Sequence, residues 1–154
     1  MALSKLRFAF KREPDVAYTV PQFKRIESAI SEYLLRDDYG SGVKEVYIVI
    51  VLIDPEHVKQ FSSKSPIYRR GKYKIGGPGS YLTCENTLEF DVIPRLGAVR
   101  NAKTTEDLAA LLGEALAVVY PLLRETEIPD FKMSRFVEDL KRALSKISAA
   151  GDTS

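Results

Sequence analysis

Apolar and polar residues alternate near the start of the chain. Leu6, Phe8 and Phe10 are separated by single residues, which is the period-2 pattern of a half-buried β-strand. The segment 43–53 is instead β-branched and almost continuously apolar, which predicts a strand covered on both faces. A third strand is predicted over residues 81–93, where apolar side chains alternate with acidic side chains and threonines. These three segments predict a small sheet.

Apolar residues spaced three and four apart predict the helices, which cover residues 21–37, 105–123 and 129–148. The second helix begins at a pair of threonines, either of which suits the N-cap. It is apolar nearly all round, so we expect it to be the most buried helix, with Pro121 kinking or ending it. A shorter helix is expected over residues 54–61, which open with the helix-starting pair Asp-Pro.

The order of these elements favours one α+β domain over residues 1–154. We expect a small, mainly antiparallel sheet of about three strands, with helices packed mostly on one face. The strands at 43–53 and 81–93 are expected to be antiparallel neighbours across a long loop at 62–80. Residues 149–154 are expected to form a frayed tail.

Composition excludes several classes of protein. A chain of 154 residues that is 45% hydrophobic and 29% charged is an ordinary folded domain. Its single cysteine, Cys84, excludes an intramolecular disulfide, and its single histidine, His57, excludes zinc sites that need two histidines. No apolar run reaches the roughly 20 residues that span a membrane. The N-terminus does not resemble a signal peptide, so we expect a cytoplasmic protein with no membrane partner.

The charge is unevenly distributed, although the formal net charge is only +2. Residues 58–83 hold six cations and no carboxylate, so the rest of the chain has 17 cations against 21 anions, a charge of −4. In the middle of this basic loop the cations alternate with aromatic residues: Tyr68, Arg69, Arg70, Lys72, Tyr73 and Lys74. Such a pattern is typical of a protein interface, of a plain solvated loop or of a single-stranded nucleic-acid site. Because the acidic remainder repels a polyanion, nucleic acid is disfavoured and an acidic protein partner is favoured.

Three carboxylates, Glu85, Glu89 and Asp91, are predicted to share one face of the third strand. Glu89 and Asp91 would lie about 7 Å apart, close enough to ligate a metal or to act as an acid/base pair. Nucleases that use a Glu-x-Lys pattern need a lysine where this chain has Asp91. We therefore interpret these residues as the wet face of an antiparallel strand or as a second partner-binding patch, with no metal site.

Enzymatic chemistry finds little support in the remaining motifs. The glycine-rich residues 76–80 lead into a strand, and no Lys-Ser/Thr pair follows them, so they are not a phosphate-binding loop. Cys84 is predicted to face the core, where a thiol packs as a small hydrophobe and does not become a nucleophile. We expect no catalytic pair between Cys84 and His57, no cofactor and no enzymatic activity.

The second half of the chain carries a family-like pattern. The segments concerned are KSP at 64–66, LEFDV at 88–92, AKTTED at 102–107, LAALLGEAL at 108–116, DFK at 130–132 and FVEDL at 136–140. Over residues 61–147 this pattern resembles the small α+β immunity proteins that are encoded beside bacterial polymorphic and contact-dependent toxins. The resemblance implies a non-enzymatic cytoplasmic protein that binds and neutralises one cognate toxin.

The resemblance leaves the toxin open. Immunity proteins against nucleases are often acidic, whereas this chain has a pI of about 8.6. The basic loop is therefore the expected contact for an acidic toxin surface, with the three carboxylates as a second patch. The alternatives are an RNA- or single-stranded-DNA-binding module that uses the same loop, and a small enzyme that uses the strand carboxylates.

Overall fold

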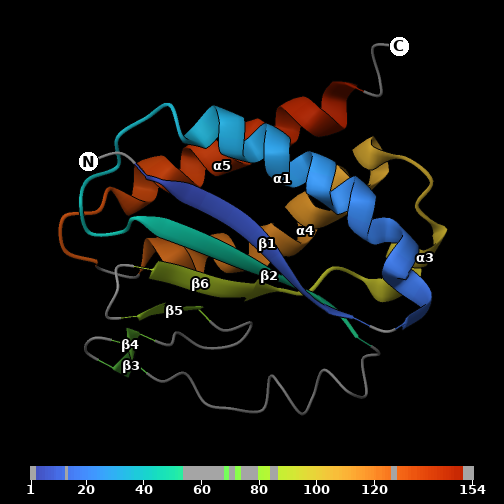
Figure 1. Ribbon diagram of the computed structural model, residues 1–154, viewed down its shortest axis with the longest axis horizontal. Helices are drawn as coiled ribbons and strands as arrows, with labels where there is room; N and C mark the ends of the chain where they lie inside the picture. The colour runs from blue at the N-terminus through green and yellow to red at the C-terminus, as the bar shows by residue number, and fades with distance from the viewer. Residues whose placement is uncertain are drawn as a thin grey trace.

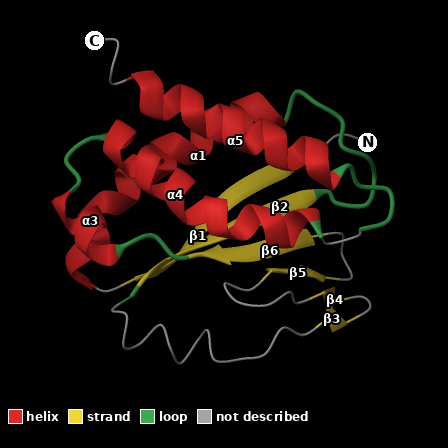
Figure 2. Cartoon of the chain, turned by 180° about the vertical axis from the view of Figure 1, so that it is seen from behind, coloured by secondary structure: helices red, strands yellow, loops and turns green. Residues whose placement is uncertain are grey.

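The structure is a computed structural model in which helices and strands form two layers (Figure 1). The residues that it describes are 3–12, 14–53, 68–69, 72–73, 80–83, 87–125 and 128–150. The long helices lie together on one face of a sheet, as the view from behind in Figure 2 shows. This arrangement confirms the predicted α+β class.

The sheet has the strand order β1-β2-β6-β5. Its long strands, β1 (Lys5–Arg12), β2 (Glu45–Leu52) and β6 (Thr87–Val92), are all parallel. The short β5 (Ser80–Thr83) is antiparallel to β6 and lies beyond it in the strand order. The prediction of a mainly antiparallel sheet is therefore wrong, as is the predicted antiparallel pairing of the second and third strands.

A chain reversal explains this error. Residues 81–93 were expected to form one strand, but they contribute to β5 and β6, which are antiparallel to each other. Because of that reversal, β6 runs in the same direction as β2. The connection from β1 to β2 contains α1 (Val20–Leu34), and a helical crossover is the usual connection between parallel neighbours.

The second long helix, α4 (Thr105–Arg124), follows the prediction at its start. The Oγ1 atom of Thr104 accepts a hydrogen bond from the backbone N–H of Asp107 at 3.1 Å, so Thr104 is the N-cap. Pro121 lies inside α4 and does not end it. The helix is also not covered all round, because Val118 is 62% exposed.

The last helix, α5 (Met133–Ala150), packs against both α4 and α1 (Figure 2). It contains the first two residues of the expected tail, and residues 151–154 lie outside the described part of the chain. Two short helices were not predicted: the 3-10 helix η1 (Pro14–Thr19) and α3 (Leu96–Asn101). The helix expected over residues 54–61 also lies outside the described residues.

The hydrophobic core lies between the sheet and the helices. Alternate residues of the strands are buried in it, because successive side chains of a strand point to opposite faces. These residues are Leu6 and Phe8 of β1, Val46, Ile48, Ile50 and Leu52 of β2, and Leu88, Phe90 and Val92 of β6. The helices complete it with aromatic and aliphatic side chains, such as Phe23 of α1 and Phe136 of α5. The aromatic rings of Phe10 and Phe23 join the sheet to α1, with their centroids 5.8 Å apart.

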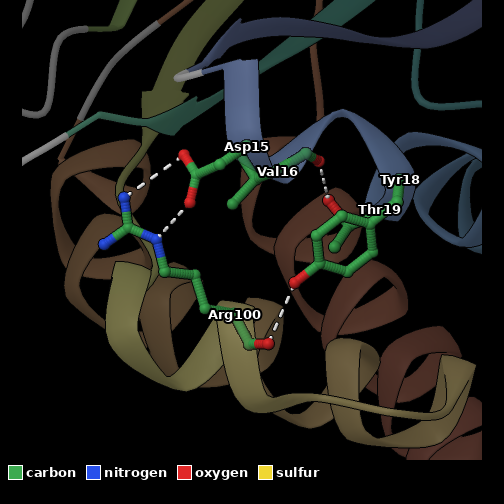
Figure 3. A network of polar contacts seen from close by, with 5 residues as sticks. All are labelled: Asp15, Val16, Tyr18, Thr19 and Arg100. Carbon is green, nitrogen blue, oxygen red and sulfur yellow. Dashed lines mark hydrogen bonds and ion pairs between the residues drawn. The ribbon is translucent and has the colours of Figure 1, made fainter.

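A polar cluster connects η1 to α3 (Figure 3). The guanidinium group of Arg100 donates to both carboxylate oxygens of Asp15, at 2.6 and 3.3 Å, and its hydrogen bond lowers the pKa of that carboxyl group. The Tyr18 hydroxyl donates to the backbone oxygen of Arg100 at 2.9 Å. Within η1, Thr19 donates to the carbonyl of Val16 at 2.7 Å. These bonds hold together two segments that are about 85 residues apart in sequence.

No helix in the described part of the chain is both long and apolar enough to cross a membrane.

Candidate protein-binding surface

The sheet face opposite the helices carries the predicted carboxylates. In β6 the side chains of Leu88, Phe90 and Val92 are buried in the core. Glu89 and Asp91 alternate with them and are half-buried on the opposite face. The structure therefore places these two carboxylates side by side on one strand face, whereas Glu85 lies outside the described residues.

Parallel pairing brings basic and aromatic side chains to the same face. Arg7 of β1 is the register partner of Tyr47 in β2, and Tyr47 is the partner of Glu89 in β6. On the far side of Glu89, its register partner in β5 is Tyr81. Since neighbouring strands are about 4.8 Å apart, the backbones of Arg7 and Glu89 are separated by roughly 10 Å. We call the row Arg7, Tyr47 and Glu89 the charged row of the sheet.

A second row on this face is more apolar. Ala9 is the register partner of Val49, and Val49 is the partner of Asp91. Val49 and Val51 are only 5% and 2% exposed, so the middle of β2 is buried on this face as well, between the basic strand β1 and the acidic strand β6. The groups that a partner can reach on this face are therefore mainly the charged side chains of β1 and β6.

The electrostatic environment of Glu89 is unfavourable for its charge. Partial burial raises the pKa of its carboxyl group, and the neighbouring carboxylate of Asp91 raises it further. Lys11 of β1 opposes both effects. A cation brought by a partner would therefore relieve a cost that the free protein carries at neutral pH.

Glu45 and Lys5 lie next to the charged row on the same face. Tyr47 donates its hydroxyl to a carboxylate oxygen of Glu45, at 3.2 Å on the same strand. Glu45 is in turn the register partner of Lys5 in β1. Lys5 of β1 therefore lies beside Glu45 of β2 at one end of this face, and β2 separates the other basic residues of β1 from the carboxylates of β6.

The basic loop contains a short hairpin. Its strands are β3 (Tyr68–Arg69) and β4 (Lys72–Tyr73), in which Tyr68 pairs with Tyr73 and Arg69 pairs with Lys72. The loop expected over residues 62–80 is therefore not entirely without regular structure. Figure 1 shows the hairpin beside β5, and β4 contacts that strand. Arg70 and Lys74, the other predicted binding residues, lie outside the described part of the chain.

The hairpin and the carboxylates thus belong to one region of the molecule. The chain passes from β4 to β5, and β5 pairs with β6, which carries Glu89 and Asp91. Sequence reasoning identified both groups but did not identify the basic residues of β1. The carboxylates lie between these residues and the hairpin. Alternation with Leu6 and Phe8 already placed Arg7 on the face away from the core. Only the strand order placed it beside Tyr47 and Glu89.

The structure does not describe the motifs weighed for enzymatic chemistry. Cys84, His57 and the glycines at 76–79 are all outside the described residues. Within the described ranges, no cluster of three or more His, Cys, Asp or Glu side chains could hold a metal ion. The face built by β1, β2 and β6 carries charges of both signs and the aromatic ring of Tyr47, which suits recognition.

The sequence fits the family described as Immunity protein 44 over residues 7–146, a span that begins within β1 and ends within α5. The chain belongs to the Immunity protein 44 family. Membership of this family confirms the resemblance to toxin immunity proteins that the second half of the sequence indicated. The match extends that resemblance to α1 and most of β1, which the sequence pattern did not include.

Searches of curated proteins and of solved structures give no significant match to the chain. For this Immunity protein 44 family member, the family name points to toxin neutralisation and names no binding surface.

Proposed function

We propose that the protein binds a cognate bacterial toxin in the cytoplasm and neutralises it stoichiometrically, without an enzymatic reaction of its own. Binding would occlude the active site of the toxin or another surface that the toxin needs. The observation that carries this proposal is the match to an immunity-protein family over residues 7–146. The toxin system would be of the polymorphic or contact-dependent type.

The proposed toxin-binding surface combines residues of the basic loop, the carboxylates of the third predicted strand and the charged row. It includes Tyr68, Arg69, Arg70, Lys72, Tyr73 and Lys74 of the basic loop, and Glu85, Glu89 and Asp91 at the third predicted strand. To these the fold adds Arg7 and Tyr47. Arginine and tyrosine are enriched among the residues that dominate binding energy, and complementary charges mainly set association rate and specificity.

The edge of β1 is a poor alternative docking site. The backbone N–H of Phe8 donates to the carboxylate of Glu27 at 2.7 Å. The hydroxyl of Ser31 donates to the carbonyl of Leu6 at 2.9 Å. Both side chains belong to α1, so they occupy the backbone groups that an added strand would need. This favours recognition through the sheet face and the hairpin.

Co-expression with the toxin domain encoded beside the gene tests the function directly. We expect wild-type protein to restore growth and to co-elute with the toxin as a stable complex at high salt. Growth arrest despite soluble protein, with no complex on size exclusion, would refute toxin neutralisation.

A pair of charge reversals tests the surface. Arg7→Glu is expected to weaken toxin binding by about tenfold or more, because Arg7 lies in the charged row. Arg25→Glu is the matched control, since Arg25 is exposed on α1, on the opposite side of the sheet. The combined Arg69→Glu and Arg70→Glu change tests the basic loop in the same calorimetric titration. Equal affinities for all variants would remove the sheet face and the loop from the interface.

The nucleic-acid alternative is supported by the alternation of cations and tyrosines in the basic loop. It predicts oligonucleotide binding that weakens steeply as salt concentration rises, because each neutralised phosphate releases counterions. Binding to a fluorescent single-stranded RNA at low and high salt distinguishes the two functions. Against it, the carboxylates of Glu45, Glu89 and Asp91 share the face with the cations of β1.

A further inference from the structure

A groove of about 420 Å³ lies between α4 and α5. These helices cover the other face of the sheet from the one described above (Figure 2). On α4 it is lined by residues at a spacing of four, namely Ala109, Gly113, Ala117 and Pro121. On α5 it is lined by Lys141 and by two serines of the following turns. Small residues at four-residue spacing leave a channel along a helix into which the ridge of another helix can pack.

Gly113 is the centre of this row, and the protein's own packing does not require a glycine there. A Cβ atom added at Gly113 would have no heavy atom within 4 Å among the described residues. Glycine inside a helix is less stable than alanine, because it loses more conformational freedom on folding. The missing side chain therefore widens the groove without improving the packing of the free protein.

Tyr120 gives a second, independent observation. This residue lines the groove and is 5% exposed, yet its hydroxyl has no hydrogen-bond partner in the described part of the chain. Buried hydroxyl groups in folded proteins are normally paired. Burial raises the pKa of the phenol, so the group is a neutral donor. The oxygen is closed off from solvent in the free protein, so an acceptor on a partner would supply the missing bond once the Tyr120 side chain turns towards the groove.

The charge that lines the groove is positive. Two charged side chains line it, Lys141 and Arg124, and Arg124 is paired with Glu138 at 2.5 Å. Three other cations of α5 also have partners: Arg135 with Asp37, Arg142 with Asp139, and Lys146 with the ring of Tyr33. Lys141 has no ion-pair partner among the described residues, and it lines the groove. A carboxylate is the group that complements it.

We propose that this groove binds one α-helix of a partner protein, with small or apolar side chains along Gly113 and a carboxylate that pairs with Lys141. The partner is the toxin, so its identity rests on the proposed function, whereas the chemistry of the helix rests on the groove alone. The toxin would then contact two surfaces, the sheet face and the helical layer, or this groove would be the principal contact.

A defined peptide tests the groove without the toxin. The probe is a synthetic helix of alanine, leucine and glutamate, of about 18 residues or five turns, compared with the same peptide carrying lysine in place of glutamate. We expect the glutamate peptide to shift the amide NMR signals of Ala109, Gly113 and Ala117, and to bind about tenfold more tightly than the lysine peptide. Lys141→Glu should reverse that preference. Shifts that avoid α4 and α5, or no preference between the peptides, would overturn the proposal.

Matched glycine variants connect the groove to the toxin. Gly113→Leu fills the groove, whereas Gly97→Leu places the same side chain on α3, where a Cβ atom also has nothing within 4 Å among the described residues. Both variants should keep the wild-type circular dichroism spectrum. We expect Gly113→Leu to weaken binding of the peptide and of the toxin by about tenfold, and Gly97→Leu to leave both unchanged.

The two proposals fail in different ways. If the wild-type protein does not bind the toxin, the proposed function fails, while the peptide titration still decides whether the groove accepts an acidic helix. If the toxin binds wild-type protein and Gly113→Leu equally well, toxin neutralisation stands and the groove is not its docking site.

Discussion

Glu89 is a charged residue in a place that penalises its charge. Its side chain is half-buried on β6 beside Asp91, and burial is the larger of the two effects that raise its pKa. A carboxyl group whose pKa is higher in the folded chain destabilises that chain above the folded pKa. Below the ordinary value of 4.5 both states are protonated, and the penalty vanishes. The residue therefore fits a role in binding better than a role in stability.

Replacing Glu89 with glutamine removes this penalty. We expect Glu89→Gln to raise the free energy of unfolding at pH 7, and the gain to disappear as the pH falls through the raised pKa towards 4.5. Urea denaturation at pH 7 and at pH 4 measures both values. Glu32→Gln is the control, because Glu32 is exposed and its pair with Arg36 joins two solvated side chains. A variant that is less stable than wild type at pH 7 would contradict the argument.

At this scale, sequence alone could predict the face on which Glu89 lies but not its environment. The alternation with Leu88 and Phe90 places it away from the core. Its neighbours Arg7 and Tyr47 come from strands more than 40 residues away, so no local pattern could reveal them. For the same reason the residue was interpreted as part of a wet antiparallel face, although it lies next to a parallel strand.

At the scale of elements, two loops at one end of the helical layer fit closely together. The N–H of Gly42 donates to the carbonyl of Asp130 at 2.9 Å, and the N–H of Lys132 donates to the carbonyl of Tyr39 at 2.7 Å. Gly40 has a φ of 104°, and a Cβ atom there would lie 2.0 Å from the carbonyl oxygen of Asp130. The start of α5 is therefore positioned by a loop that precedes β2.

Because of this contact, adding one methyl group at Gly40 should destabilise the fold strongly. Gly40→Ala is expected to lower the free energy of unfolding by about 3 kcal/mol, because the new Cβ atom meets backbone and the φ value disfavours any other residue. Gly97→Ala is the control and should leave stability unchanged or raise it by up to about 1 kcal/mol, since its Cβ atom enters open space in the described structure and alanine is more stable than glycine in a helix. Thermal unfolding of the two variants measures the contrast. Similar melting temperatures would show that the loops separate easily.

The ends of an element could be predicted from the sequence where neighbouring residues alone determine them. Thr104 was a candidate cap because acidic residues follow it, and it does cap α4. The reversal between β5 and β6 was missed because residues 81–93 alternate without a Gly, Pro or Asn-Gly signal strong enough to end the strand. The sequence also contains no clear signal for α3, because this helix is only six residues long and contains Gly97, which has a low helix propensity.

At the scale of the whole molecule, the parallel sheet decides which surfaces are available. The continuous apolar run of β2 already fitted a parallel strand, which is buried on both faces. The helices cover one face, and the other face combines β1 cations with β6 carboxylates. A parallel edge strand such as β1 also exposes unpaired backbone groups unless something covers them. Here α1 covers that edge with Glu27 and Ser31.

Removing that cover should change how the molecules associate. The combined change Glu27→Ala and Ser31→Ala frees the N–H of Phe8 and the carbonyl of Leu6, the groups with which a second strand could pair. We expect a loss of about 1–3 kcal/mol in the free energy of unfolding, and a shift towards larger species on size exclusion with light scattering.

The matched control for this change lies on the same helix. Ser28→Ala with Glu32→Ala removes the same two kinds of side chain from exposed positions of α1, so it should leave the oligomeric state as in wild type. If the Glu27 and Ser31 variant loses stability but keeps the wild-type size, the two bonds hold α1 on the sheet without guarding the edge. If both variants associate, the cause is the lost surface charge. Association of the first variant alone would identify α1 as the element that keeps the sheet edge closed and leaves the sheet face, the hairpin and the α4–α5 groove for recognition.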